Sequence, residues 1–223
     1  MKKFFIAPSI LSADFARLGE NIQEVLDAGA DMIHFDVMDN HYVPNLTFGP
    51  MVLQSLRKYK ISSPIDVHLM VNSVDSLIPV FAASGADFIT FHPETSSNIN
   101  ETLNLIKKYG CKAGLAVNPD TSIDHLKRFF NKLDLILLMS VNPGFPGQKF
   151  IPSVLNKIYQ LNQYIRNVFP NILLEVDGGI NINNFYDIAQ AGANILVMGS
   201  AIFYAADYRK TIQFMKSKLS ILC

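Results

Sequence analysis

The sequence has few cysteines and no excess of charge of either sign. Its 223 residues include two cysteines, Cys111 and Cys223, which favours free thiols in a reducing compartment over a disulfide framework. Lysine plus arginine and aspartate plus glutamate both number 19, and no basic run occurs. The sequence therefore predicts neither nucleic acid nor an anionic membrane as the main partner.

Long hydrophobic runs are also missing. No apolar stretch approaches the roughly 18 residues that a membrane-spanning helix needs. The stretch from Lys2 to Ala7 has the charged-then-apolar order of a signal peptide, but Pro8 and Ser9 interrupt it, which favours a first β-strand. We therefore expect a cytoplasmic protein. Hydrophobic residues make up 49% and charged residues 17%, a composition that supports a large core.

A short phrase recurs along the chain. It occurs as Ala28-Gly29-Ala30-Asp31, as Ser84-Gly85-Ala86-Asp87 and as Ala191-Gly192-Ala193-Asn194. Each copy joins the end of a helical pattern to an apolar run, and its glycine can take the left-handed conformation that ends a helix. The repeat predicts a chain built from βα units.

Eight short apolar runs, separated by stretches with helical spacing, predict alternating strands and helices. The predicted strands lie at about residues 5–9, 31–36, 64–69, 87–92, 112–117, 134–140, 172–177 and 194–199. Eight such units in this length predict an α/β protein with a single domain over residues 1–223, folded as a closed parallel (β/α)8 TIM barrel. An open doubly wound sheet is the alternative, but no Gly-x-Gly-x-x-Gly follows the first strand to support it.

Polar side chains stand at the ends of three predicted strands, where the active sites of such barrels lie. They are His34, Asp36, Asp66, His68, Glu175 and Asp177. Two histidines and two carboxylates that converge there could bind a divalent metal ion such as zinc, iron, manganese or cobalt. Taken singly, a strand-end histidine is equally a hydrogen-bonded core residue and an aspartate a helix cap, so both interpretations stay open.

Three glycine-containing segments at strand ends have the features of a phosphate site. Their glycines let backbone amides approach a ligand, and the last segment begins a helix. The segments are Gly144-Phe145-Pro146-Gly147, Gly178-Gly179 and Gly199-Ser200. Each glycine could equally serve a tight turn.

Three methionines, Met38, Met70 and Met139, also fall at or just past predicted strand ends. Methionine at such positions commonly fills gaps in a core. An apolar lid beside a metal-bound intermediate is the second interpretation.

Six motifs, in order, resemble the ribulose-phosphate 3-epimerase family. They are Ala7-Pro8-Ser9-Ile10-Leu11-Ser12-Ala13-Asp14-Phe15, His34-Phe35-Asp36-Val37-Met38-Asp39, Val43-Pro44-Asn45-Leu46-Thr47-Phe48-Gly49-Pro50, Asp66-Val67-His68-Leu69-Met70-Val71, Val141-Asn142-Pro143-Gly144-Phe145 and Val176-Asp177-Gly178-Gly179-Ile180. The likeness extends from Ile6 to about Phe203.

The resemblance implies a barrel of the ribulose-phosphate-binding type and an isomerase of the pentose phosphate pathway. It implies that D-ribulose 5-phosphate and D-xylulose 5-phosphate interconvert through an enediolate, with Asp36 and Asp177 as the two acid/base groups. It implies one divalent metal ion per chain on His34, Asp36, His68 and Asp177. Substrate contacts are implied for Ser9, His68, the Gly144 to Gly147 loop, Asp177 to Gly179, and Gly199-Ser200. We also expect a homo-oligomer.

Two residues depart from the family pattern. Pro146 replaces a glycine and lacks an amide donor, which puts a phosphate hydrogen bond at that position in doubt. Asn40 also replaces a glycine, but asparagine tolerates a positive φ.

Three rival functions remain. An epimerase of a phosphorylated ketohexose, such as allulose 6-phosphate, would use the same ligands. A lyase of a similar barrel would carry Asp-x-Lys-x-x-Asp, whereas the stretch from Asp36 to Asn40 has no lysine. A non-catalytic sugar-phosphate binder would not need both Asp36 and Asp177.

Overall fold

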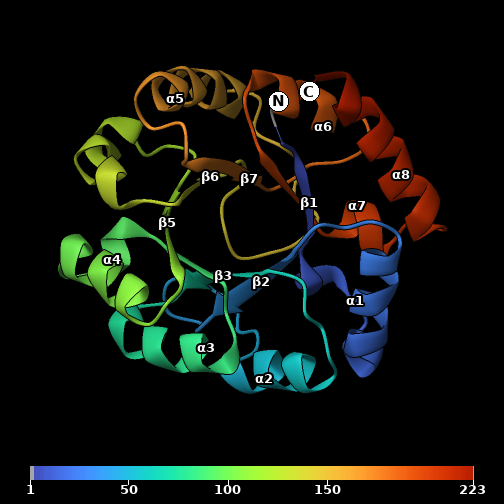
Figure 1. Ribbon diagram of the computed structural model, residues 1–223, viewed down its shortest axis with the longest axis horizontal. Coiled ribbons are helices and arrows are strands. Elements are labelled where there is room, and N and C mark those ends of the chain that lie inside the picture. Colours follow the sequence, from blue (N-terminus) through green and yellow to red (C-terminus); the bar gives the residue numbers. More distant parts are fainter. Residues whose placement is uncertain (1–2, 223) are drawn as a thin grey trace.

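Eight parallel strands form a ring that a layer of helices surrounds (Figure 1). The computed structural model describes residues 3–222, so Met1, Lys2 and Cys223 lie outside the described residues. The strands are β1 (Phe5–Pro8), β2 (Ile33–Met38), β3 (Ile65–Met70), β4 (Phe88–Phe91), β5 (Lys112–Val117), β6 (Leu135–Met139), β7 (Leu173–Asp177) and β8 (Ile195–Met198). This arrangement confirms the predicted (β/α)8 barrel and excludes the open doubly wound sheet.

The strands pair in the order β1-β8-β7-β6-β5-β4-β3-β2. The seam between β1 and β2 is closed by an isolated parallel bridge between Ser9 and His34. Below it, the backbone amide of Asp31 donates to the carbonyl of Ile6 at 3.0 Å. The ring of strands is therefore continuous from the carboxyl end of β1, where Ser9 bridges to His34 of β2.

Helices follow the strands as the repeated phrase predicts. They are α1 (Leu18–Asp27), α2 (Pro50–Lys58), α3 (Ile78–Ser84), α4 (Ile99–Lys108), α5 (Val154–Val168), α6 (Phe185–Ala191), α7 (Ser200–Phe203) and α8 (Tyr208–Leu219). Between β5 and β6 the connection is a 3₁₀ helix, η5 (Ile123–Lys132). The glycines of the phrase have positive φ values, 112° at Gly29, 103° at Gly85 and 143° at Gly192. This conformation ends α1, α3 and α6 and turns the chain into the next strand.

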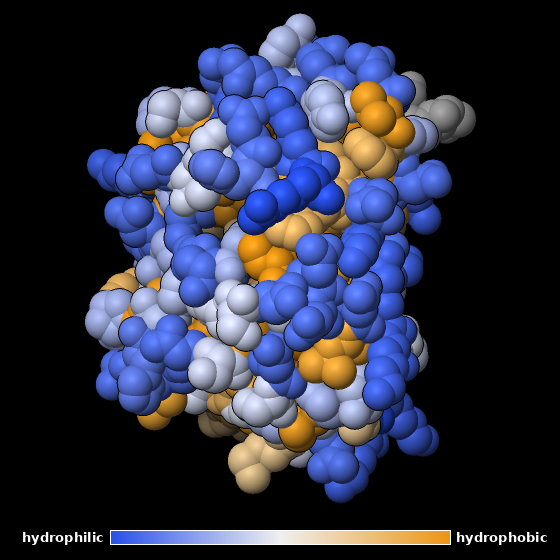
Figure 2. Space-filling model, turned by 90° about the vertical axis from the view of Figure 1, so that its left-hand side faces the viewer, coloured by the Kyte–Doolittle hydropathy of each residue, from blue (hydrophilic) through white to orange (hydrophobic). Residues whose placement is uncertain are grey.

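The helices turn polar faces outward. The face that includes α4 is mostly hydrophilic, with separated hydrophobic residues between the polar ones (Figure 2). Among the described residues, no helix combines the length and the apolar character that crossing a membrane requires.

The core has two main layers, because alternate residues of each strand face opposite ways. One cluster lies between strands and helices and includes Phe35, Val67 and Ile89. A second cluster fills the barrel interior and includes Leu137 and Val197. Fully buried polar side chains share the interior, and a polar group enclosed in this way needs partners of its own.

Candidate active site

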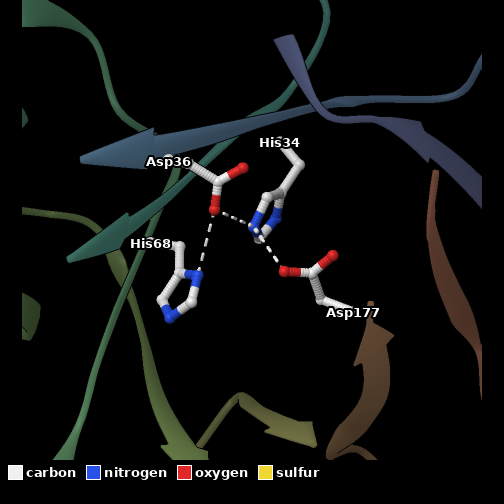
Figure 3. A group of neighbouring side chains, drawn as sticks. All are labelled: His34, Asp36, His68 and Asp177. Atoms are coloured by element: carbon white, nitrogen blue, oxygen red, sulfur yellow. Dashed lines mark hydrogen bonds and ion pairs between the residues drawn. The ribbon is translucent and has the colours of Figure 1, made fainter. Parts of the chain in front are cut away.

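Four polar side chains from three strands meet inside the barrel, beneath the cavity at the carboxyl ends of the strands. His34 and Asp36 project from β2, and strand register places them beside Asp66 and His68 of β3, respectively. Asp177 ends β7 and points toward the same centre from across the barrel (Figure 3). The alternation of side chains along the strands brings these groups to one face.

The distances within this group suit a metal ion. Asp36 Oδ1 lies 3.2 Å from His34 Nε2 and 3.2 Å from His68 Nδ1, and Asp177 Oδ2 lies 3.9 Å from His34 Nε2. One ligand atom from each of the four residues lies within 4.8 Å of the others. His34 Nε2 is buried and lacks a hydrogen bond of good geometry within the described chain. Two nitrogens and two carboxylate oxygens form a donor set that divalent transition metals accept, so the cluster could hold such an ion.

Burial and neighbouring charges together set the protonation states within this group of side chains. Burial opposes the ionised form of Asp36, but His34 and His68 hold the pKa of that carboxyl well below its usual range. Burial also opposes a charged His34, but carboxylates, Asp36 foremost, raise the pKa of that ring well above its usual value. Burial and the charge of Asp36 raise the pKa of Asp177 to about 6. The two carboxylates therefore differ in charge: Asp36 stays ionised, whereas Asp177 takes up a proton at about pH 6.

A second layer of side chains lies beneath this group. His34 Nδ1 lies 2.9 Å from Asp66 Oδ2 and 3.3 Å from Glu175 Oε1, and all three side chains are fully buried. Burial and the charge of Asp66 raise the pKa of Glu175 to about 8. The sequence identified Asp66 and Glu175 as polar strand residues, but their contact with His34 depends on the spacing between β2, β3 and β7.

His68 has a partner of its own in this layer. Its Nε2 lies 2.9 Å from Nε2 of His92, which directly follows β4 and is fully buried. Burial and the proximity of His68 lower the pKa of His92 well below its usual value. His92 was not predicted as a site residue, although its two-residue spacing from Thr90 of β4 places both side chains on the same, inner side.

Above the four side chains lies a cavity of about 670 Å³. Most of the predicted site residues line it. These are Ser9, Asp36, Met38, Met70, Met139, Gly144, Phe145, Pro146, Gly147, Asp177, Gly178, Gly179, Gly199 and Ser200. His34 and His68 have no exposed surface and lie below the floor. A substrate contact by His68 therefore stays a prediction, while its place beside Asp36 is established by the geometry.

The glycines of two of the predicted phosphate segments, Gly178-Gly179 and Gly199-Ser200, are packed tightly against neighbouring chain, whereas a Cβ at Gly147 would meet nothing within 4 Å. A Cβ added at Gly179 would overlap the amide nitrogen of Phe150, and one at Gly178 would lie 2.5 Å from a methyl group of Val141. At Gly199 a Cβ would lie 2.6 Å from Ser12 Oγ. Close packing therefore requires glycine at these three positions whether or not a ligand binds, and the positive φ values of Gly178 (119°) and Gly179 (65°) agree with the tight-turn interpretation. Their position along the cavity still leaves the segments within reach of a bound anion.

Two side-chain amides hold the start of the glycine segment in the loop after β6. Asn45 Nδ2 donates to the carbonyl of Gly144 at 2.6 Å, and Gln148 Nε2 donates to the carbonyl of Phe145 at 3.0 Å. Phe145 itself is 52% exposed. Asn40 takes a φ of 59°, the left-handed conformation that glycine favours and asparagine tolerates.

The three methionines at the ends of β2, β3 and β6 line one cavity together with Asp36 and Asp177. Met38 and Met70 pair in register on β2 and β3 and pack with Val43 in a small separate cluster. Met139 pairs in register with Asp177. All three are nearly buried and line the cavity, so they give its inner end an apolar wall.

Comparisons with known proteins agree with this geometry. The chain matches the ribulose-phosphate 3 epimerase family over residues 5–203. It is 62% identical over 219 residues to a ribulose-phosphate 3-epimerase of Buchnera aphidicola subsp. Acyrthosiphon pisum (strain APS), with 98% of this chain and 96% of that one covered. It is 60% identical over 220 residues to the ribulose-phosphate 3-epimerase of Escherichia coli (strain K12), with 99% and 98% covered. The crystal structure of KGPDC from Streptococcus mutans superposes with a TM-score of 0.74 at 13% identity over 98% of both chains, which supports the fold alone.

Proposed function

The chain belongs to the ribulose-phosphate 3-epimerase family, and from this membership we propose that it interconverts D-ribulose 5-phosphate and D-xylulose 5-phosphate. It is an epimerase of the isomerase class. The observation that carries the proposed mechanism is the placement of Asp36 and Asp177 on β2 and β7, on different sides of one cavity floor. Inversion at C3 requires a proton to leave one face and another to arrive at the opposite face, so a base on each side is needed.

The donor set beneath the cavity fits a divalent metal ion. We assign its ligands as His34, Asp36, His68 and Asp177, with zinc, iron, manganese and cobalt all compatible. Such an ion would polarise the C2 carbonyl and stabilise the negative charge that develops on the enediolate.

The two carboxylates would move the protons. Asp36 is oriented by Ser9, whose Oγ donates to Asp36 Oδ2 at 2.5 Å. Removal of the C3 proton by one carboxylate would give a planar enediolate, and the other carboxylate would return a proton on the opposite face. Met38, Met70 and Met139 would keep water away from the enediolate, because they form the apolar inner wall.

The sugar phosphate would lie at the other side of the cavity. The segments Gly178-Gly179 and Gly199-Ser200 would supply backbone amides, with a smaller share from Gly144 to Gly147 because Pro146 has no amide hydrogen. A phosphate fixed there would align C3 between the two carboxylates. A cytoplasmic location and a homo-oligomeric state stay predictions from the sequence.

Solvent exchange tests the two-base mechanism. Asp177→Asn should abolish epimerisation, while Asp36 should still exchange the C3 hydrogen of one epimer with D₂O. Asp36→Asn should show the same behaviour with the other epimer. Metal content is measured first, because both residues are assigned as ligands. A metal-loaded variant that still interconverts the epimers near the parent rate would exclude the mechanism.

A coupled assay tests the substrate. Turnover of ribulose 5-phosphate by the parent protein is compared with turnover of allulose 6-phosphate. The pentose phosphate should be preferred, and a preference for the hexose phosphate would reassign the substrate while leaving the two-base mechanism intact.

A further inference from the structure

The two ring nitrogens of His68 face different surroundings. Nδ1 faces Asp36 within the group of four, and Nε2 faces Nε2 of His92 at 2.9 Å. The two imidazole rings have centroids 5.1 Å apart and are inclined by 33°. Both side chains are fully buried. The contact is therefore a hydrogen bond between two enclosed rings.

A nitrogen-to-nitrogen contact of this length accommodates one proton. Two N–H groups facing each other would repel, and two lone pairs would leave a buried contact without a hydrogen bond. A histidine nitrogen that binds a metal ion carries no proton, so the proton of a neutral His68 must then lie on Nε2. His92 consequently accepts at Nε2 and carries its own proton on Nδ1, which faces Glu94 Oε1 at 3.8 Å.

The surroundings of His92 hold its ring in place for this role. The ring of Tyr42 packs against it with centroids 4.8 Å apart. The Tyr42 hydroxyl donates to Glu94 Oε1 at 2.7 Å, and Asn118 Nδ2 donates to the same oxygen at 2.8 Å. Residues of three loops, after β2, β4 and β5, therefore surround His92.

We propose that His92 is a positioning residue of the metal site. By accepting the Nε2 proton of His68, it holds that ring in the tautomer whose Nδ1 lone pair faces the other ligands. The inference rests on the proposed function, since it requires His68 to be a ligand. Partners that fix the orientation of a ligand histidine typically contribute about 10- to 100-fold to metal affinity.

Nitrogen NMR of the zinc-loaded parent protein tests the hydrogen bond directly. With ¹⁵N-labelled histidine, a scalar coupling should join Nε2 of His68 to Nε2 of His92, and the proton should belong to His68. His92 should be protonated at Nδ1. A spectrum in which His92 carries its proton on Nε2 would overturn the proposal.

Zinc affinity measures the consequence. His92→Phe keeps a ring of similar shape but has no acceptor, and it should bind Zn²⁺ about 10- to 100-fold more weakly in competition with a chelating dye. His92→Gln restores an acceptor and should recover most of this loss. The matched control is His125→Phe, which changes an exposed histidine of η5 and should leave affinity unchanged.

The outcomes separate this inference from the function on which it rests. Parent-like affinity in His92→Phe would overturn the positioning role, as would an equal loss in His92→Gln. If His68→Ala retains full zinc affinity, His68 is not a ligand, and the metal assignment itself fails. Thermal unfolding of each metal-free variant identifies loss of structure, and the parent NMR measurement does not depend on how any variant folds.

Discussion

Replacing Glu175 by glutamine should remove a pH dependence from the stability of the barrel. Glu175 is fully buried on β7, with its Oε1 3.3 Å from His34 Nδ1. Burial, and then the charge of Asp66, raise its pKa from 4.5 to about 8. In the metal-free protein at pH 6 this carboxyl therefore carries a proton in the folded state and has lost it in the unfolded state.

The sign and size of the effect follow from this difference. Between about pH 4.5 and pH 8 the folded state binds the additional proton, so the free energy of unfolding falls as the pH rises. One pKa unit corresponds to about 1.4 kcal/mol, and with a folded pKa of about 8 the contribution of Glu175 decreases by about 2 kcal/mol from pH 6 to pH 8. Glutamine has no titrating proton, so Glu175→Gln should lose this part of the slope while keeping the contributions of the other groups.

Urea unfolding of the metal-free proteins at pH 6, 7 and 8 measures the difference. The decrease in the free energy of unfolding from pH 6 to pH 8 should be about 2 kcal/mol larger in the parent than in Glu175→Gln. Glu101→Gln, at an exposed position of α4, should follow the parent. If parent and Glu175→Gln give parallel pH profiles, Glu175 is already ionised in the folded protein and the reasoning is refuted.

Two further predictions concern binding. His34→Ala and His68→Ala should each lose the metal ion in elemental analysis, because each removes one nitrogen ligand from the group of four. The control His125→Ala should keep the ion. Full metal occupancy in both ligand variants would disprove the assignment. Gly199→Val should raise KM at least tenfold, about 1.4 kcal/mol of binding, because its side chain would meet Ser12 Oγ and enter the cavity. Gly49→Val is the control, since a Cβ at Gly49 would meet nothing within 4 Å, and an unchanged KM in Gly199→Val would place the phosphate elsewhere.

The sequence predicted the barrel and the placement of the four polar side chains because both depend on local periodicity. Strand two was predicted at 31–36 and lies at Ile33–Met38, and the two-residue alternation puts His34 and Asp36 on the same face in either case. Contacts set by neighbouring strands were not predictable in this way. The pairing of His68 with His92 depends on the register of β3 with β4, and the contacts of His34 depend on how far β7 lies across the interior.

The 3₁₀ geometry of η5 could not be predicted from the sequence either. Its apolar positions Leu126, Phe129 and Phe130 suit an α-helix equally well, and all three are buried. A residue distant in sequence fixes the chain just before this segment: Lys157 of α5 donates hydrogen bonds to the carbonyls of Asn118, Pro119 and Thr121. The pattern of apolar residues predicts which side of a helix is buried, but it does not determine the helix type.

The pairing of the first strand with the last has a consequence for the chain while it is being synthesised. β1 is synthesised before every other strand, yet its ladder partner is β8: Phe5 pairs with Ile195, 190 positions later (195 minus 5). Until β8 has left the ribosome, the growing sheet has two unpaired edges, and unpaired edges can accept strands from other chains. The nascent chain therefore stays open to mispairing at both edges of the sheet until β8 is made and joins β1.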